Sequence, residues 1–396
     1  MISIIAIIIG VVILIITTLS HMCEKIGRYY YGSAPSSSNP NTYIVFGRLG
    51  GFKEEKLDAE LKTHGFKKIR IVGRRIPSFA TFVWTSLDDR YKFSPLSFKI
   101  QCQTKNVIED TRAEIITRKD YLYLEMARNE PDVAREHFAQ SWNLKDFKWP
   151  SGTITESPWF IVRPIGGTFF GGKDIFRITN EQEYKDACRF YHSNRLVENV
   201  LVSEYLDDPY LYEGRKFHLR LYFMIRIVTG KPIYGELWGL SDDDLSLPRG
   251  KILTAKLPYV RDHIENGEIH DTHAKSTPSA IFFPTMAAAI HHPAAPDEPL
   301  DVGDVRRQLR QIADALTRQA ERAHVCPYPE SQNAFEIFGL DLLVVRKNKT
   351  GPVTPRVVLL EVNDRVGYDT PDSPLTERIQ DDYFRWVWNF GIQPTL

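Results

Sequence analysis

Residues 335–345 (FEIFGLDLLVV) and 357–363 (VVLLEVN) are two short apolar runs, joined by a link rich in turn-forming residues at 347–352 (KNKTGP). Each run has the length and composition of a buried β-strand. Asp341 lies inside the first run and Glu361 inside the second, although burying a carboxylate is costly unless it is paired or bound to a metal. The two runs therefore predict neighbouring strands that carry a polar site.

Three side chains of these strands form a candidate metal site. Side chains alternate along a strand, so Glu361 and Asn363 are expected on one face, and Leu360 and Val362 on the other. With Asp341 they would make an oxygen-only ligand set, which Mg²⁺ prefers and completes with phosphate oxygens and water. Each carboxylate alone also fits an ordinary strand end at the solvent edge. The pair, together with the Glu-Val-Asn spacing, favours the metal site.

The composition is that of an ordinary globular protein. The chain has 396 residues, long enough for more than one domain or for one large composite domain. Its 50 Lys and Arg residues balance 50 Asp and Glu residues, so no net charge favours nucleic acid, and we expect no nucleic-acid partner. The four cysteines are scattered without a Cys-x-x-Cys pair, which argues against a disulfide framework or a zinc site and fits a reducing compartment.

Residues 1–22 are expected to form a single-pass membrane anchor. Residues 2–19 are almost wholly apolar and carry no charge, close to the roughly 20 residues that cross a bilayer. A cleaved signal peptide would have a basic start, a shorter apolar region and a small-residue cleavage site. Lys25 and Arg28 follow the segment, so the positive-inside tendency predicts that the body of the protein faces the cytosol. A buried core helix is the alternative.

The rest of the chain divides into a linker and two expected domains. Residues 23–41 form a flexible linker, and residues 42–150 alternate short strands and helices, as in a small α/β domain. Residues 151–396 form the second domain, with a central part at about 159–240 and a C-terminal part at about 241–396 that holds an Ala- and Pro-rich insertion at 278–300. Helices are expected at 53–64 (ended by Gly65), 118–129, 181–194, 304–323 and 376–389.

A glycine-rich loop at 165–173 (IGGTFFGGK) lies between two apolar runs. Glycine lets backbone N–H groups approach an anion closely, and Arg163 and Lys173 supply positive charge on either side. No Gly-Lys-Ser/Thr opens a helix, and a strand follows Gly172, so this is neither a Walker loop nor a Rossmann fingerprint. Phosphate binding by the loop and an ordinary glycine-rich hairpin are equal alternatives.

The run at 216–226 (KFHLRLYFMIR) predicts a strand with basic side chains along one face. Lys216, His218 and Arg220 share that face, and the apolar residues between them take the other. Positive side chains in such a row would repel one another unless an anion lay over them. The alternative, which is more common, is an edge strand with these side chains in water. His270 and His273 have no further Cys or His at a convincing spacing, so we expect no zinc site there.

From about residue 106 to residue 363, the chain resembles the tubulin–tyrosine ligase-like family, a branch of the ATP-grasp ligases. The resemblance rests on the order and spacing of several separated motifs rather than on one of them. These motifs are TRKDxL (117–122), IVRP (161–164) with the glycine loop, EYL (204–206) with Pro209, KFHLR (216–220), FxxFGxD (335–341) and LEVN (360–363). Residues 42–105 carry no motif of the family.

The resemblance implies an α/β (α+β) ATP-grasp fold in which the nucleotide lies between two antiparallel sheets. It implies that Asp341, Glu361 and Asn363 bind Mg²⁺, with Mn²⁺ as the alternative. It also implies that Arg220, with Lys216 and His218 on the same face, lies near the transferring phosphate or the acyl acceptor. The implied nucleotide contacts are Lys119, Arg163 (where the family usually has a phosphate-binding Lys), Gly171, Gly172, Lys173 and an adenine hinge of Glu204, Tyr205 and Leu206.

The implied activity is ATP- and Mg²⁺-dependent ligation of a free amino acid (Tyr, Glu or Gly) to a protein carboxylate through an acylphosphate, with tubulin as the first candidate acceptor. His218 departs from the Asp of many members, and DRVGY at 364–368 replaces the usual small-residue and proline run. Both departures lie on the acceptor side, so they leave the amino acid and the acceptor open. The alternatives are a catalytically inactive, membrane-tethered binding module and a ligase of a small peptide or metabolite.

Overall fold

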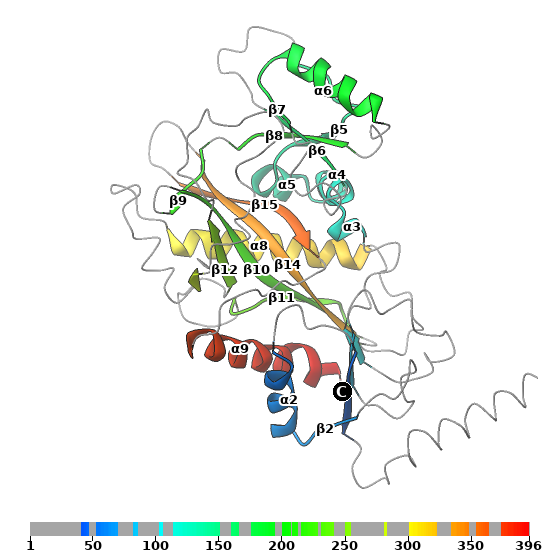
Figure 1. The fold of residues 1–396 in the computed structure, drawn as a ribbon, viewed down its shortest axis with the longest axis vertical. Helices are drawn as coiled ribbons and strands as arrows, with labels where there is room; N and C mark the ends of the chain where they lie inside the picture. The colour runs from blue at the N-terminus through cyan, green and yellow to red at the C-terminus, as the bar shows by residue number, and fades with distance from the viewer. Residues whose placement is uncertain are drawn as a thin grey trace, which may run out of the picture.

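Two β-sheets organise the described part of the chain (Figure 1). The smaller sheet has four antiparallel strands in the order β5 (Ser141–Asn143), β8 (Val200–Glu204), β6 (Phe160–Pro164) and β7 (Phe176–Ile178). The larger sheet follows the order β13 (Ile281–Phe282), β12 (Gly250–Thr254), β10 (Arg215–Ile227), β14 (Ala334–Arg346), β4 (Gln103–Lys105), β3 (Phe82–Thr85), β1 (Thr42–Phe46) and β2 (Lys67–Lys68). Off this path, β9 (Leu211–Tyr212) and β11 (Tyr234–Leu237) pair with β10, and β15 (Pro355–Asn363) pairs with β14.

The computed structural model describes residues 41–46, 53–69, 82–85, 103–105, 114–150, 160–165, 176–194, 200–206, 208–212, 215–228, 231–240, 250–254, 281–282, 301–322, 334–347, 354–363 and 374–395. Several predictions fall on other residues and lie outside this description: the anchor at 1–22, the linker up to residue 40, the glycine loop with Gly171, Gly172 and Lys173, the two histidines His270 and His273, and the insertion at 278–300. No helix within the described ranges is long and apolar enough to cross a membrane.

The larger sheet is mixed. Strands β10 to β15 pair with one another in antiparallel fashion, whereas β4 is parallel to β14, β3 to β4, and β1 to β3. The described strands before residue 106 therefore lengthen the sheet that carries Asp341, and β5 contributes to the smaller sheet. The boundary expected near residue 150 is not a break between two separate sheets, because β4 joins β14 at Ala334 and Phe335.

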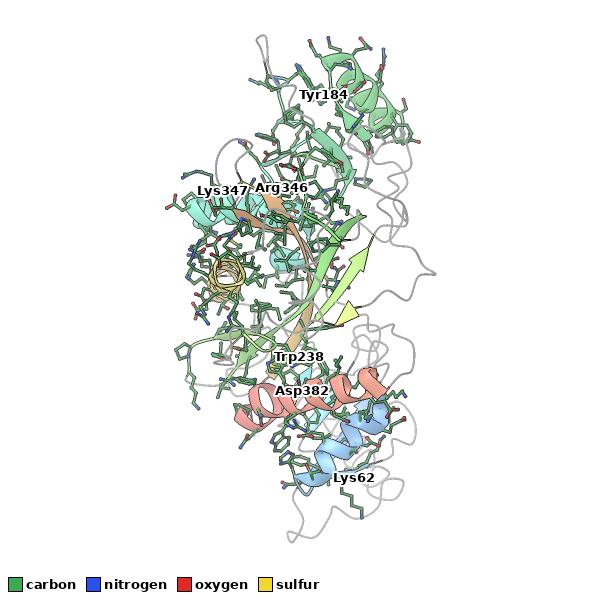
Figure 2. The ribbon with its side chains drawn as sticks, turned by 90° about the vertical axis from the view of Figure 1, so that its left-hand side faces the viewer. Lys62, Tyr184, Trp238, Arg346, Lys347 and Asp382 are labelled. Carbon is green, nitrogen blue, oxygen red and sulfur yellow. The ribbon has the colours of Figure 1, made fainter. Side chains whose placement is uncertain are left out.

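One face of the larger sheet is covered by α8 (Val302–Arg322), α3 (Glu114–Thr117), α4 (Lys119–Asn129) and α5 (Pro131–His137). Figure 2 shows α8 end-on beside this sheet. The apolar positions that predicted an amphipathic helix are buried, among them Val305, Leu309, Ile312 and Leu316. Gly235 on β11 allows close packing there, because a Cβ at this position would clash with Thr317 of α8. This face holds the main apolar core.

The opposite face has a second core beneath α9 (Pro374–Trp386), the π-helical turns η5 (Val387–Ile392) and α2 (Glu54–Thr63), followed by the short 3-10 helix η6 (Gln393–Thr395). Figure 1 shows α9 and α2 at one end of the molecule and the smaller sheet at the other. Tyr222 and Met224 of β10 and Phe335 of β14 point into this core. The predicted end of α2 is confirmed, since Gly65 has a φ of 79°.

The smaller sheet has its own core, covered by α6 (Glu181–Ser193). The side chain of Asn180 accepts a hydrogen bond of 2.9 Å from the backbone N–H of Glu183, which caps the first turn of α6. Figure 2 shows Tyr184 of this helix at one end of the molecule, with Arg346 and Lys347, at the end of β14, between it and Trp238.

Strand β15 pairs only with β14 among the described strands, and its outer edge carries an isolated parallel bridge between Leu359 and Phe138. Side chains from helices bond to the outer backbone groups instead. Gln308 of α8 donates to the Pro355 carbonyl at 2.7 Å and accepts from the Val357 N–H at 2.8 Å, as a neighbouring strand would. His137 Nδ1 lies 3.0 Å from the Val357 carbonyl oxygen. The strand that carries Glu361 is thus held by helices on its outer side.

Candidate functional site

Three charged residues lie in one row across the larger sheet. Arg220 of β10 pairs in register with Asp341 of β14, and Asp341 pairs in register with Glu361 of β15. Gly339 and Asn363 are paired two residues further along the same two strands. The structure therefore brings together Asp341, Glu361 and Asn363, and adds Arg220 directly beside Asp341.

A β-bulge turns Glu361 toward Asp341. Leu342 pairs with Leu359 and Asp341 pairs with Glu361, so Leu360 is an extra residue in β15. Regular alternation would place Glu361 on the face of Leu359, which is buried in the main core. The bulge re-aims the carboxylate, as bulges next to functional sites often do. The expectation that Leu360 points away from this face is wrong, because Leu360 packs against Leu343, Val345 and Val358 beside the carboxylates.

Arg220 and Asp341 form a two-pronged ion pair. The guanidinium donates from one NH2 group to Asp341 Oδ2 at 2.7 Å and from Nε to Oδ1. Asp341 is only 3% exposed, so the pair is largely withdrawn from water. Gly339 makes room for the arginine, because a Cβ there would lie 3.1 Å from Arg220 Cδ. The Phe-Gly-Leu-Asp segment thus supplies the carboxylate and the space that its partner needs.

Glu361 has a cation of its own. Lys119, at the start of α4, places Nζ 2.7 Å from Glu361 Oε2. Asn363 lies between the two carboxylates, and its Nδ2 donates to Asp341 Oδ2 at 3.1 Å and to Glu361 Oε1 at 3.2 Å. The two carboxylates are therefore balanced by two cations, Arg220 and Lys119.

The two carboxyl groups titrate differently. Burial raises the pKa of Asp341 to about 6, and the nearby carboxylate of Glu361 adds to this, while Arg220 opposes it. Burial would also raise the pKa of Glu361, but Lys119 and Arg163 hold it below its usual range. Of the two carboxyl groups, Asp341 is therefore the one that takes up a proton more readily.

The donor set fits a hard divalent cation. The candidate ligands are the two carboxylates of Asp341 and Glu361 and the amide of Asn363. The described residues contain no group of three His, Cys, Asp or Glu side chains that could hold a metal ion. The Asn363 amide turns its nitrogen to both carboxylates, and the same group presents an oxygen when it turns over. Carboxylate and amide oxygens are ligands that Mg²⁺ prefers.

Next to the carboxylates lies an apolar cluster formed by Leu343, Val345 and Val358, with Leu206 and Leu360 packed against it. Leu206 is the last residue of the predicted adenine hinge, so this hinge lies against β14 and β15, close to the charged row. Apolar side chains next to the hinge are the kind of lining that a planar base packs against.

Two basic side chains of β10 contact different parts of the site. Lys216 is 8% exposed and places Nζ 5.4 Å from the ring centroid of Tyr205, in the hinge. Arg220 instead bonds to Asp341, and His218 lies half-buried between them along the strand. The structure therefore places Lys216 with the hinge and Arg220 with the carboxylates.

Arg163 links the smaller sheet to this site. Its NH2 group donates to the hydroxyl of Tyr123 at 2.9 Å, and the Tyr123 hydroxyl donates to the carbonyl of Leu360. Within the described part of the chain, the buried Nε of Arg163 has no hydrogen-bond partner, which suits a cation that binds an anion. Sequence reasoning missed Tyr123, although its position one helical turn after Lys119 was a usable signal.

Residues 100–234 match the model of the tubulin–tyrosine ligase family. Among curated proteins, human tubulin polyglutamylase TTLL5 is 25% identical over 186 residues, which is 44% of this chain and 12% of that protein. A probable tubulin–tyrosine ligase of Schizosaccharomyces pombe is 21% identical over 250 residues, 57% of this chain and 56% of that protein. The chain thus spans a small part of the polyglutamylase and about half of the yeast protein.

Among solved structures, the C-terminal domain of K. lactis Pby1, described as an ATP-grasp enzyme interacting with the mRNA decapping enzyme Dcp2, superimposes with a TM-score of 0.58. The two are 17% identical, and the match covers 89% of this chain and 94% of that domain. At this level of identity the likeness concerns the fold, and it confirms the expected ATP-grasp architecture.

Proposed function

Because the chain is a tubulin–tyrosine ligase-like protein with an ATP-grasp fold, we propose that it is an ATP- and Mg²⁺-dependent ligase that joins an amino acid (Tyr, Glu or Gly) to a protein carboxylate. The observation that carries this proposal is the charged row of Arg220, Asp341 and Glu361, completed by Asn363 and flanked by the apolar cluster. A purely structural ion pair would need neither the second carboxylate nor the bulge that aims it.

In the proposed reaction, Mg·ATP would transfer its γ-phosphoryl group to the acceptor carboxylate, which releases ADP and gives an acylphosphate. The amine of the amino acid would then attack the acyl carbon, and inorganic phosphate would leave. Asp341, Glu361 and Asn363 hold the metal. Arg163 and Lys119 contribute positive charge on the nucleotide side, and Arg220 contributes it toward the acceptor. The protein acts mainly by positioning and by charge stabilisation.

Ligation is tested with the full-length chain, Mg·ATP, tubulin and each of the three amino acids in turn. We expect a mass increase of the acceptor and a matching release of ADP that both require one amino acid. Asp341→Asn and Glu361→Gln should abolish both signals, while Asp132→Asn, at an exposed carboxylate of α5, should leave them unchanged. Full activity of Asp341→Asn would contradict the metal assignment.

The choice of tubulin as first acceptor rests on relatives whose names describe tubulin polyglutamylases and a tubulin–tyrosine ligase. ADP release with a short free peptide but not with tubulin would favour a peptide ligase instead. An inactive binding module would show no rise in melting temperature with Mg·ATP. A working site, by contrast, should gain about 2.7 kcal/mol of stability at a nucleotide concentration 100 times its Kd.

We also propose that residues 1–22 anchor the protein in a membrane with its catalytic part in the cytosol. The apolar, uncharged run at 2–19 supports this. Expressed in cells, the full-length chain should stay with membranes after alkaline extraction, and the chain without residues 1–22 should not. Extraction of both proteins to the same extent would count against an anchor.

A further inference from the structure

Helix α4 contacts two consecutive residues of β15 from two of its own residues one turn apart. Lys119 pairs with the carboxylate of Glu361, and Tyr123, four residues later, donates its hydroxyl to the carbonyl of Leu360. Leu360 is the extra residue of the bulge. One face of α4 therefore contacts both the residue that forms the bulge and the carboxylate that the bulge aims.

The carbonyl of Leu360 has a particular need for this donor. A bulged residue is removed from the regular ladder of its own sheet. In addition, β15 pairs only with β14 among the described strands, and the isolated bridge on its outer side joins Phe138 to Leu359, one residue before Leu360. The Tyr123 hydroxyl therefore supplies, from a helix, the donor that a strand supplies elsewhere.

The same hydroxyl accepts a hydrogen bond of 2.9 Å from Arg163 in the smaller sheet. The guanidinium carbon of Arg163 lies 5.6 Å from the centroid of the Tyr123 ring. Tyr123 is 3% exposed and its ring packs edge-on against Phe138 at 5.8 Å, so the hydroxyl is held in one place. A single oxygen thus joins the cation of one sheet to the bulge of the other.

We propose that Tyr123 is a positioning residue. Its hydroxyl fixes the bulge that directs Glu361 toward the metal, and it orients Arg163 toward the nucleotide phosphates. This inference rests on the proposed function, since the metal and nucleotide are those of that site. Tyr123 acts through Glu361 and Arg163 and touches neither ligand itself.

The test compares Tyr123→Phe with Tyr121→Phe in the full-length chain. Tyr123→Phe keeps the buried ring and removes only the hydroxyl. Tyr121 is on the same helix but is 39% exposed, so it provides a matched control.

Binding of the non-hydrolysable analogue AMP-PNP is measured as Mg²⁺ is varied, well below the melting temperature of each protein. We expect Tyr123→Phe to raise the half-saturating Mg²⁺ concentration about tenfold or more, the usual effect of losing a group that orients a metal ligand. Tyr121→Phe should match the wild type.

A second comparison shows whether Tyr123 acts through Glu361. In a Glu361→Gln background the metal dependence is already impaired, so adding Tyr123→Phe should change it by less than twofold. Equal losses in both backgrounds would contradict action through Glu361. A Tyr123→Phe protein that melts lower but keeps the wild-type Mg²⁺ dependence would show a merely structural hydroxyl, and would overturn the inference. If the wild type binds no Mg·AMP-PNP at all, it is the proposed function that fails.

Discussion

Gly339 shows how much of the site depends on the absence of one side chain. It pairs with Asn363 across the strands, and the Arg220 side chain that bonds to Asp341 lies against it. A methyl group here would lie 3.1 Å from Arg220 Cδ, closer than such atoms normally approach. The backbone needs no glycine for a turn at this position, so the requirement is one of space for the arginine.

Gly339→Ala should therefore displace the Arg220 guanidinium while leaving the strand intact. We expect a fall in kcat/KM of between about tenfold and 100-fold, because small displacements of positioned groups have effects of this size, with a melting temperature close to that of the wild type. Gly65→Ala is the converse control. Its φ of 79° disfavours a side chain, so it should lose about 1 kcal/mol of stability and keep full activity per folded molecule. An unchanged kcat/KM for Gly339→Ala would refute this role.

His137 predicts a dependence of stability on pH. It is buried, with Nδ1 3.0 Å from the Val357 carbonyl oxygen and Nε2 3.1 Å from Gln311 Oε1. Burial lowers its pKa, although both hydrogen bonds oppose this. The unfolded chain, where the pKa is about 6.5, therefore binds the proton more readily than the folded protein. The contribution of neutral His137 to the free energy of unfolding is therefore fully present above the pKa of the unfolded chain. It is lost as the pH falls through the lower pKa that His137 has in the folded protein.

We expect the urea midpoint of the wild type to fall between pH 7 and pH 5 by more than that of His137→Gln, measured by circular dichroism. His192→Gln changes an exposed histidine of α6 and should keep the wild-type slope. Comparing slopes between variants removes the contribution of other groups, such as Asp341. Parallel slopes for all three proteins would show that His137 does not contribute.

At the scale of single elements, the bulge in β15 determines which face of the sheet receives Glu361. Deletion of Leu360 would remove the bulge, and Glu361, then directly after Leu359, would by regular alternation stay on the face opposite Leu359 and in register with Asp341. We expect the deletion to keep stabilisation by Mg·ATP, because Glu361 still faces Asp341, and to lower the melting temperature, because the contacts of Leu360 with the apolar cluster and with Tyr123 are lost. Thermal melting with and without Mg·ATP measures both effects.

Leu360→Ala provides the comparison, because it keeps the extra residue and removes only a partly buried side chain. It should cost less stability than the deletion and retain the response to Mg·ATP. Loss of that response in the deletion would show that Glu361 does not keep its direction once Leu360 is removed.

The contrast between helices and this strand explains what the sequence alone could predict. The buried positions of α8 recur with the period of a helix, and Gly65 marks the end of α2, so both were predicted from local pattern. A bulge adds one residue without changing composition, so Leu360 looked like any other apolar strand residue. The pairing of Arg220 with Asp341 also depends on register between strands 121 positions apart, which local pattern does not contain.

Across the whole molecule, the N-terminal strands and the candidate site share one sheet and one core. Phe82 stacks on Phe335 with ring centroids 6.1 Å apart, and Trp84 packs edge-on against both Phe335 and Phe384. The expectation of a small N-terminal domain came from the alternation of strands and helices in residues 42–150. Partner choice between distant strands is set by the folded core rather than by neighbours in sequence, so the joining of β4 to β14 had no local signal.

This arrangement predicts that a core substitution in the N-terminal strands destabilises the distant site. Trp84→Ala removes a fully buried ring and should cost about 3–5 kcal/mol. Because Trp84 and Phe335 share a core, we expect the transition that Mg·ATP stabilises to move to lower temperature as a whole, as seen by scanning calorimetry. A separate early transition, with the Mg·ATP-sensitive one left in place, would show that the N-terminal strands unfold independently.

The side chains along the outer edge of β15 also limit how another polypeptide could pair with this strand. An open strand edge offers a row of backbone groups on which a visiting peptide can add itself as another strand. Here Gln308, His137 and Tyr123 already occupy groups on that edge. An extended polypeptide therefore finds few open backbone groups between Pro355 and Leu360, the part of this edge that leads up to Glu361.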